Sequence, residues 1–113
     1  MSLRSPAPSL SEFETCAAEA AEFLKLLANE NRLLVLCWLA ETKEASVNAL
    51  AQKVGLSQSA LSQHLARLKD DGLVSFRREA QTLYYQVSDP RVLRALALLK
   101  DLFRPDFPKT RRS

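Results

Sequence analysis

Apolar residues recur at helical spacing along most of this chain. In the first segment they follow one another at intervals of three and four residues, at Leu10, Phe13, Ala17, Ala20, Leu24 and Leu27. The side chains off this seam are charged, at Glu12, Glu14, Glu19, Glu22 and Lys25. Heptad spacing of this kind predicts an amphipathic helix. Its apolar face packs either on the core of its own domain or against a partner helix.

The next segment is apolar nearly all round. It runs from Arg32 to about Glu41, with the sequence RLLVLCWLAE, and Asn29 is placed to cap its first turn. A helix without a polar face is expected at the centre of a domain. We therefore predict this to be the most buried helix, followed by a short loop from Thr42 to Ala45.

Two shorter amphipathic segments come next. The first, SVNALAQKVG, has apolar residues at positions 47, 50, 51 and 54. Ser46 is placed to cap its start, and Gly55 stands where a left-handed residue would end it. The second begins after Ser57 and has Leu61, Leu65 and Leu68 on one face. Two short helices joined through a glycine turn predict a helix-turn-helix.

A hairpin and a last helix complete the pattern. Val74 to Glu79 and Thr82 to Val87 are rich in β-branched and aromatic residues and are joined at Ala80-Gln81, which predicts two strands. Asp89 followed by Pro90 is typical of a helix start. The segment after them has an apolar stripe of Val92, Leu96, Leu99 and Phe103, widened by Leu93, Leu98 and Leu102.

The expected fold is a mainly α-helical winged helix-turn-helix with a small β-hairpin wing, in the order α-α-α-α-β-β-α. The 113 residues, 47% of them hydrophobic, are enough for one such domain. We expect a flexible arm at 1–9, the DNA-binding and dimerisation domain at 10–104 and a basic tail at 105–113. Because the first and last helices carry more apolar surface than one small core can cover, we predict that they form the interface of a homodimer.

Charge is distributed unevenly along the chain. The total is +3, but residues 1–30 have a net charge of −3 and residues 57–113 a net charge of +5. The positive part coincides with the second helix of the helix-turn-helix and the hairpin, which favours double-stranded DNA as the partner. No apolar run reaches the ~18 residues of a membrane span, and the N-terminus does not resemble a secretory signal, so we expect a cytoplasmic protein.

The predicted DNA-contacting face lies opposite Leu61, Leu65 and Leu68. Ser59 and Gln63 point away from that apolar side and are expected to contact base edges. Hairpin residues would reach a phosphate or the adjacent minor groove. Because side chains alternate along a strand, only one of Arg77 and Arg78 can face the DNA. For the same reason, one of Tyr84 and Tyr85 is expected in the core. The complete set of predicted DNA-binding residues is Ser57, Gln58, Ser59, Ser62, Gln63, Arg67, Arg77, Arg78 and Gln81.

The segment VGLSQSALSQHLARLKDDGLV, followed by RREAQTLYYQV, resembles the DNA-binding region of the ArsR/SmtB family of winged-helix repressors. ANENRLLVLCWL is similar to the family's second helix, and the likeness, closest to the BigR/HlyU/NolR-like branch, covers about residues 15–105. It implies a homodimeric transcriptional regulator, usually a repressor that an inducer releases from its operator. The identity of the inducer does not follow from it.

The resemblance also bears on what the protein senses. Metal-sensing members carry either a Cys-x-Cys in the region of the second and third helices or a His/Asp/Glu set on the last helix. Here only Cys37 remains of the first pattern, and the single histidine is His64. We therefore expect no metal site and no cofactor. Thiol-sensing members pair a cysteine at the position of Cys37 with one near the end of the last helix, where this chain has Arg104. Cys16 would supply a second sulfur only if the first helix lies beside Cys37.

Three interpretations follow from these patterns. The first is a dimeric repressor of a palindromic operator, with Cys37 as a small apolar residue in a buried helix. The second is a redox- or persulfide-responsive repressor that senses through Cys37. The third, from another class, is a basic protein-interaction module without specific DNA binding. An enzyme is not expected, because no nucleophile–base pair, phosphate loop or catalytic carboxylate pair is present in the sequence.

Overall fold

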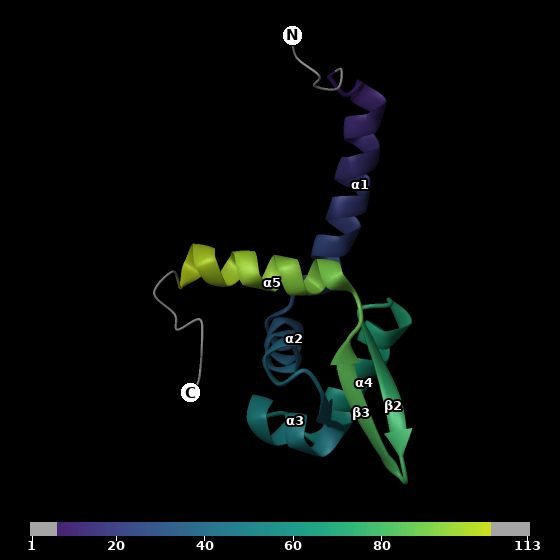
Figure 1. The fold of residues 1–113 in the computed structure, drawn as a ribbon, viewed down its shortest axis with the longest axis vertical. Coiled ribbons are helices and arrows are strands. Elements are labelled where there is room, and N and C mark those ends of the chain that lie inside the picture. The colour runs from purple at the N-terminus through teal and green to yellow at the C-terminus, as the bar shows by residue number, and fades with distance from the viewer. Residues whose placement is uncertain (1–6, 105–113) are drawn as a thin grey trace.

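The computed structural model describes residues 7–104, which form five helices and three strands (Figure 1). Their order is α1 (Leu10–Leu27), α2 (Glu30–Thr42), β1 (Ala45–Ser46), α3 (Val47–Val54), α4 (Gln58–Asp70), β2 (Val74–Glu79), β3 (Thr82–Val87) and α5 (Pro90–Phe103). The predicted winged helix-turn-helix fold is confirmed. The predicted basic tail and most of the predicted N-terminal arm lie outside the described residues. Within residues 7–104, none of the helices combines the length and apolar character needed to cross a membrane.

Polar caps set the helix boundaries, as the sequence predicted. The hydroxyl of Ser46 accepts a hydrogen bond from the backbone N–H of Ala49, and that of Ser57 accepts from Ala60. Gly55 ends α3 with a φ of 73°, a left-handed conformation that costs glycine little because it has no Cβ. These three residues therefore fix the turn that sets α4 relative to α3.

The three strands form an antiparallel sheet in the order β1-β3-β2. Tyr84 of β3 pairs with Arg77 of β2 on one side and with Ser46 of β1 on the other. The sequence placed Ala45 in a loop, and this prediction was wrong. A strand of two residues is too short to show alternation, and its partner β3 lies far along the chain beyond two helices, so only the tertiary fold brings the two together.

The core lies between α2, α3, α4, α5 and the sheet. Leu61, Leu65 and Leu68 of α4 are fully buried, which confirms the predicted apolar face of this helix. The other buried residues are Leu27, Val35, Leu36, Leu39, Ala45, Leu50, Ala51, Leu73, Val74, Tyr85, Val92 and Leu96. The hydrophobic core of the domain is therefore complete without most of α1.

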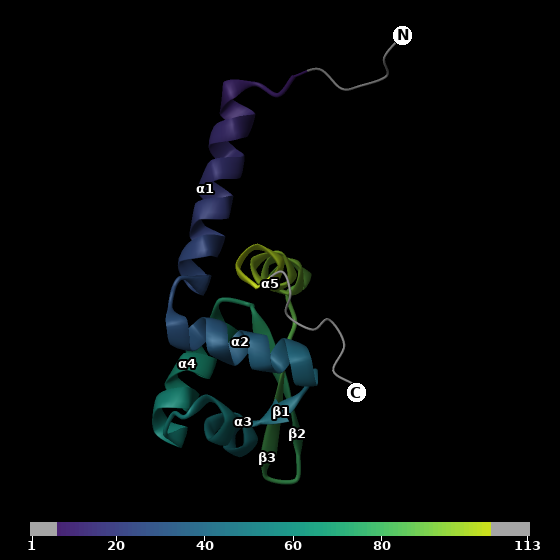
Figure 2. The same cartoon turned by 90° about the vertical axis from the view of Figure 1, so that its left-hand side faces the viewer.

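Helix α1 projects away from the rest of the molecule, as two perpendicular views show (Figures 1 and 2). Every residue from Leu10 to Glu22 is exposed, and only Phe23, Leu26 and Leu27 at its C-terminal end pack against the core. The alternative that the α1 seam packs on the core of its own chain is therefore wrong for the most part. An apolar face of this length needs another surface to cover it.

Burial of α2 is less complete than predicted. Val35, Leu36 and Leu39 are buried, but Leu34 and Cys37 are exposed in the single chain. A helix without a polar face can be buried on all sides. Its sequence does not tell whether its own chain or a second chain buries each side. The prediction of Cys37 as a buried core residue was accordingly wrong for the isolated chain.

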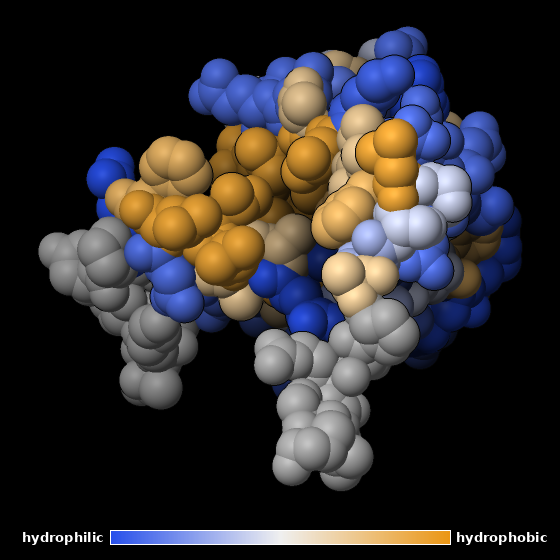
Figure 3. Space-filling model, turned by 90° about the horizontal axis from the view of Figure 1, so that it is seen from above, coloured by the Kyte–Doolittle hydropathy of each residue, from blue (hydrophilic) through white to orange (hydrophobic). Residues whose placement is uncertain are grey.

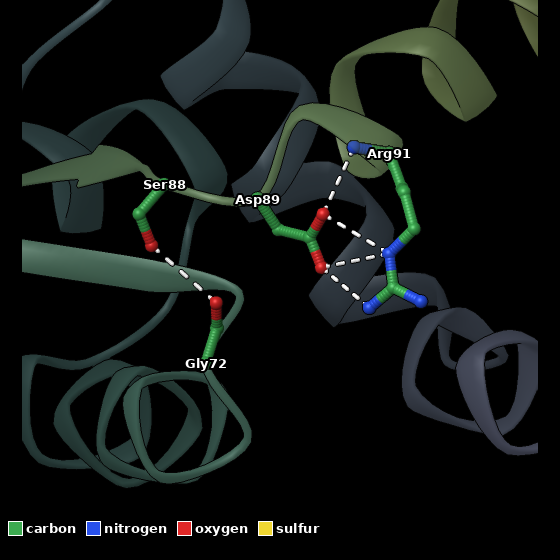
Figure 4. Close-up of polar contacts among 4 residues, drawn as sticks. All are labelled: Gly72, Ser88, Asp89 and Arg91. Carbon is green, nitrogen blue, oxygen red and sulfur yellow. Dashed lines mark hydrogen bonds and ion pairs between the residues drawn. The ribbon is translucent and has the colours of Figure 1, made fainter.

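A polar junction fixes the start of α5 next to the sheet (Figure 4). The Asp89 carboxylate accepts a hydrogen bond from the backbone N–H of Arg91 at 2.9 Å and forms an ion pair with the Arg91 guanidinium at 2.7 Å. The Ser88 hydroxyl donates to the carbonyl of Gly72 at 3.4 Å. The Arg91 guanidinium also lies 4.6 Å from the ring centre of Phe23, so this junction connects α5 to the base of α1.

Candidate nucleic-acid interface

The face of α4 opposite its buried leucines is polar and open to solvent. Ser59 and Gln63, which the sequence placed at its centre, are both exposed. The other predicted contact residues of this segment, Ser57, Gln58, Ser62 and Arg67, are exposed as well. A helix that is anchored on one side and carries short hydrogen-bonding side chains on the other is suited to enter a major groove.

A hollow of about 490 Å³ lies between the start of α3, the start of α4 and the hairpin. It is lined by Ser46, Val47, Asn48, Gln58, Ser62, Gln81, Thr82, Leu83 and Tyr84. Three predicted DNA-binding residues, Gln58, Ser62 and Gln81, meet here although they come from a helix and a turn that are far apart in the sequence. Their hydroxyl and amide groups can bind base edges or the oxygens of a phosphodiester strand.

Sequence reasoning missed Asn48 and Thr82, which line the same hollow. The side-chain carbonyl of Asn48 accepts a hydrogen bond from the side-chain amide of Gln58 at 2.8 Å. This bond connects the first turn of α3 to the first turn of α4 and orients Gln58. Asn48 could have been noticed because it is a polar residue close after the cap of α3, but the helix was interpreted from its apolar stripe alone.

The two adjacent arginines of the hairpin have different surroundings. Arg77 forms ion pairs with Glu44 and Glu79 and stacks on Tyr84. Arg78 is exposed and pairs across the hairpin with Leu83. The two therefore lie on opposite faces, as strand alternation predicts, and the same alternation buries Tyr85.

The two cysteines lie in different parts of the chain. Cys16 is on the projecting part of α1, seven residues before the first residue that packs against the core, which is about 10 Å along a helix. Cys37 of α2 lines hollows of about 230 and 290 Å³, and both also include Leu96 and Lys100 of α5. Partial burial raises the pKa of the Cys37 thiol, and the positive charge of Lys100 offsets part of that rise. At neutral pH this thiol is therefore mostly protonated and weakly nucleophilic.

Among residues 7–104, metal-ligating side chains do not gather into one cluster. In the part of the chain that the structure describes, no three side chains of the types His, Cys, Asp and Glu lie closely enough together to hold a metal ion. The candidate site therefore consists of the polar face of α4, the hollow beside it and the hairpin.

An anchored polar helix, a capped turn before it and a basic hairpin beside it define a winged helix-turn-helix DNA-binding protein. Residues 29–75 match the model of the bacterial regulatory proteins of the arsR family. The chain is 54% identical over 87 residues to the nodulation protein NolR of Rhizobium meliloti, covering 77% of this chain and 70% of that protein. The protein belongs to the ArsR family of transcriptional regulators.

Two further relatives agree with this assignment. The transcriptional activator HlyU of Vibrio cholerae is 48% identical over 95 residues, covering 84% of this chain and 87% of that protein. The crystal structure of HlyU from Vibrio vulnificus matches with a TM-score of 0.78 at 49% identity, covering 83% of this chain and 97% of the other. The protein is therefore a DNA-binding transcriptional regulator and not an enzyme, and the interpretation as a protein-interaction module is set aside.

Proposed function

We propose that this protein is a homodimeric repressor that binds a palindromic operator in double-stranded DNA through its two α4 helices. The observation that carries the proposal is the division of α4 into a fully buried leucine side and an exposed polar side. Because the leucine side is packed in the core, Ser59 and Gln63 face away from the domain. Such an arrangement favours sequence-specific contacts over general attraction to a polyanion.

The individual contacts follow from position. Ser59 and Gln63 contact base edges, and Gln58, at the end of the helix that enters the groove, joins them. Ser57, Ser62 and Arg67 bind the phosphate backbone on either side of the groove. Gln81 and one of the two hairpin arginines reach the neighbouring backbone or minor groove.

A second copy of this chain is the proposed cover for the exposed apolar surface of α1 and α5. Figure 3 looks onto this side of the molecule and shows hydrophobic surface spread over much of it. The exposed large hydrophobic residues of α1 and α5 are Leu10, Phe13, Leu24, Leu93, Leu98, Leu102 and Phe103. The two helices also differ in charge, with a net charge of −3 on α1 and +2 on α5, so α1 of one protomer attracts α5 of the other. A two-fold dimer would present its two α4 helices to major grooves about 34 Å apart.

Repression is the proposed direction of control because it requires only that the dimer occupy DNA at a promoter. The name of the Vibrio cholerae relative describes an activator. A rise in transcription from a bound promoter when the protein is added would therefore reverse this part of the proposal and leave DNA recognition intact.

The DNA-recognition proposal is tested by Gln63→Ala. If Gln63 contacts a base, the variant should lose about 1–3 kcal/mol of discrimination between operator and scrambled duplex, because a bidentate amide contact is lost. Fluorescence anisotropy titrations would measure both affinities, on duplexes that the wild-type protein selects from a random-sequence pool. Unchanged discrimination would refute the role of Gln63, and equal binding of all duplexes by the wild type would refute specific recognition.

Thiol sensing through Cys37, alone or with Cys16, stays a hypothesis. Its support is the position of Cys37 beside α5, where a modified thiol would alter how α2 and α5 pack. If the hypothesis holds, polysulfide or peroxide should release the wild-type protein from its operator, and Cys37→Ser should bind DNA but no longer respond. If the wild-type protein stays bound to its operator after such treatment, the hypothesis of thiol sensing is refuted.

A further inference from the structure

We propose that Arg77 is a positioning residue which, with Glu44 and Glu79, fixes the wing relative to the body of the domain, and that Arg78 is the arginine of the wing that contacts a phosphate. This inference rests on the proposed mode of DNA binding and assigns separate tasks to two residues that the sequence could not distinguish. Glu44, which the sequence did not single out, becomes part of the binding apparatus.

All three guanidinium nitrogens of Arg77 are engaged by carboxylates. Its Nε and Nη2 donate to the two carboxylate oxygens of Glu44 at 2.8 and 3.0 Å, and its Nη1 donates to Glu79 at 2.8 Å. The guanidinium carbon lies 4.7 Å from the ring centre of Tyr84. A bidentate carboxylate pair combined with an aromatic ring holds a guanidinium in one orientation, which a single surface ion pair does not do.

The path of the Arg77 side chain crosses the sheet. Arg77 is on the edge strand β2, Tyr84 is opposite it on the central strand β3, and Glu44 directly precedes β1 at the other edge. Strand β1 pairs only with Tyr84 and Tyr85, so the hairpin from Arg78 to Leu83 extends beyond this short strand. The hairpin projects past α3 in both views (Figures 1 and 2). Arg77 therefore connects the base of the projecting hairpin to the loop between α2 and β1.

Charge argues against Arg77 as a phosphate contact. With two carboxylates bound, the group formed by Arg77, Glu44 and Glu79 has a net charge of −1, which repels a phosphate. To bind DNA, Arg77 would first have to release Glu44.

Arg78 is oriented differently. It is exposed and shares its face of the hairpin with Phe76 and with Tyr85, which is buried in the core. The ammonium group of Lys69, from α4, lies 5.3 Å from the ring centre of Phe76. The face of Arg78 is therefore the one turned toward the recognition helix, where a bound backbone would pass.

The Arg77 side chain is half exposed, so its ion pairs add little to global stability. Its effect is expected on the orientation of the wing, and so on DNA affinity, with little change in the midpoint of thermal unfolding.

The experiment measures the affinity of full-length variants for duplexes selected by the wild-type protein, over a series of salt concentrations. Arg77→Lys keeps the positive charge but cannot form the bidentate pair, and Glu44→Asp keeps the carboxylate charge but is too short to hold the same pair. We expect both to bind severalfold more weakly with an unchanged slope of log K against log salt. Arg78→Ala should reduce the magnitude of that slope by about 1, because one phosphate contact is lost.

Several outcomes would overturn the inference. Tighter binding with a steeper slope in Glu44→Asp would show that Arg77, once released, contacts phosphate. Wild-type behaviour of Arg77→Lys, or an unchanged slope in Arg78→Ala, would also contradict it, as would a lowered unfolding midpoint that accounts for the weaker binding. Failure of the wild-type protein to select any duplex would instead refute the proposed function, so the two failures are distinguishable.

Discussion

At the residue scale, neighbouring side chains decide what a charged group does. Asp89 caps α5 through the backbone N–H of Arg91 and at the same time binds the guanidinium of that residue. Arg91 in turn covers the ring of Phe23 at the base of α1. One carboxylate therefore both starts a helix and orients the cation that connects α1 with α5.

This arrangement predicts a dependence of stability on pH. The hydrogen bond from the Arg91 side chain lowers the pKa of Asp89 below its usual value of about 3.9. A carboxylate with a lowered native pKa stabilises the fold above its unfolded pKa, and this contribution is lost as the pH falls through the native value. An asparagine side chain can still cap the helix but carries no charge. Asp89→Asn should therefore lose less stability at neutral pH than Asp89→Ala, which removes a cap at a cost of about 1 kcal/mol.

Urea denaturation followed by circular dichroism, at fixed protein concentration between pH 7 and pH 3, measures this dependence. The wild-type advantage over Asp89→Asn should shrink as the pH falls below about 4. A difference between the two proteins that stays constant over the whole range would show that the ion pair with Arg91 does not contribute.

At the scale of elements, local chemistry made most of the fold predictable. Helix starts at Asn29, Ser46, Ser57 and Asp89 were recognised because a capping side chain bonds to the backbone only two or three residues away. The strand β1 was missed because its hydrogen bonds go to a strand distant in sequence. The hairpin turn was placed correctly although Ala80 adopts a φ of 56°, a left-handed conformation that alanine adopts only when surrounding pairs impose it.

The candidate site was predictable to a similar degree. The α4 face could be predicted because helical periodicity relates Gln63 to Leu61 without further information. The hydrogen bond between Asn48 and Gln58 and the ion pair of Arg77 with Glu44 could not, because each joins residues from different elements. The separate surroundings of Arg77 and Arg78 therefore became visible only in the folded chain.

At the scale of the whole molecule, the projecting helix α1 is the feature that one chain leaves unexplained. Its apolar side chains are strongly exposed, with Leu10 at 73% and Phe13 at 59%, and Phe103 of α5 is 71% exposed. Apolar surface of this extent on two helices favours association with a second copy.

The dimer proposal predicts that Phe13→Glu combined with Leu102→Glu yields a monomer, because burying two unpaired carboxylates in an apolar contact is unfavourable. Light scattering should give a mass near twice the chain mass of 12.7 kDa for the wild type and near 12.7 kDa for the variant. Operator affinity should fall at least about tenfold, since each half-site would then be bound alone. Ser59→Ala, a control on α4, should keep the dimeric mass, and a wild-type protein that is monomeric at working concentrations would contradict the proposal.

The sequence by itself determined the helices, the hairpin, the helix caps and the polar face of α4, because these depend on periodicity and on bonds between near neighbours in the chain. The resemblance of its DNA-binding segment indicated the family. The tertiary structure decided which apolar faces the chain covers itself, leaving most of α1 and parts of α2 and α5 open, and which of two adjacent arginines is bound by carboxylates. Both decisions depend on contacts between segments distant in sequence, for which periodicity along one segment carries no information.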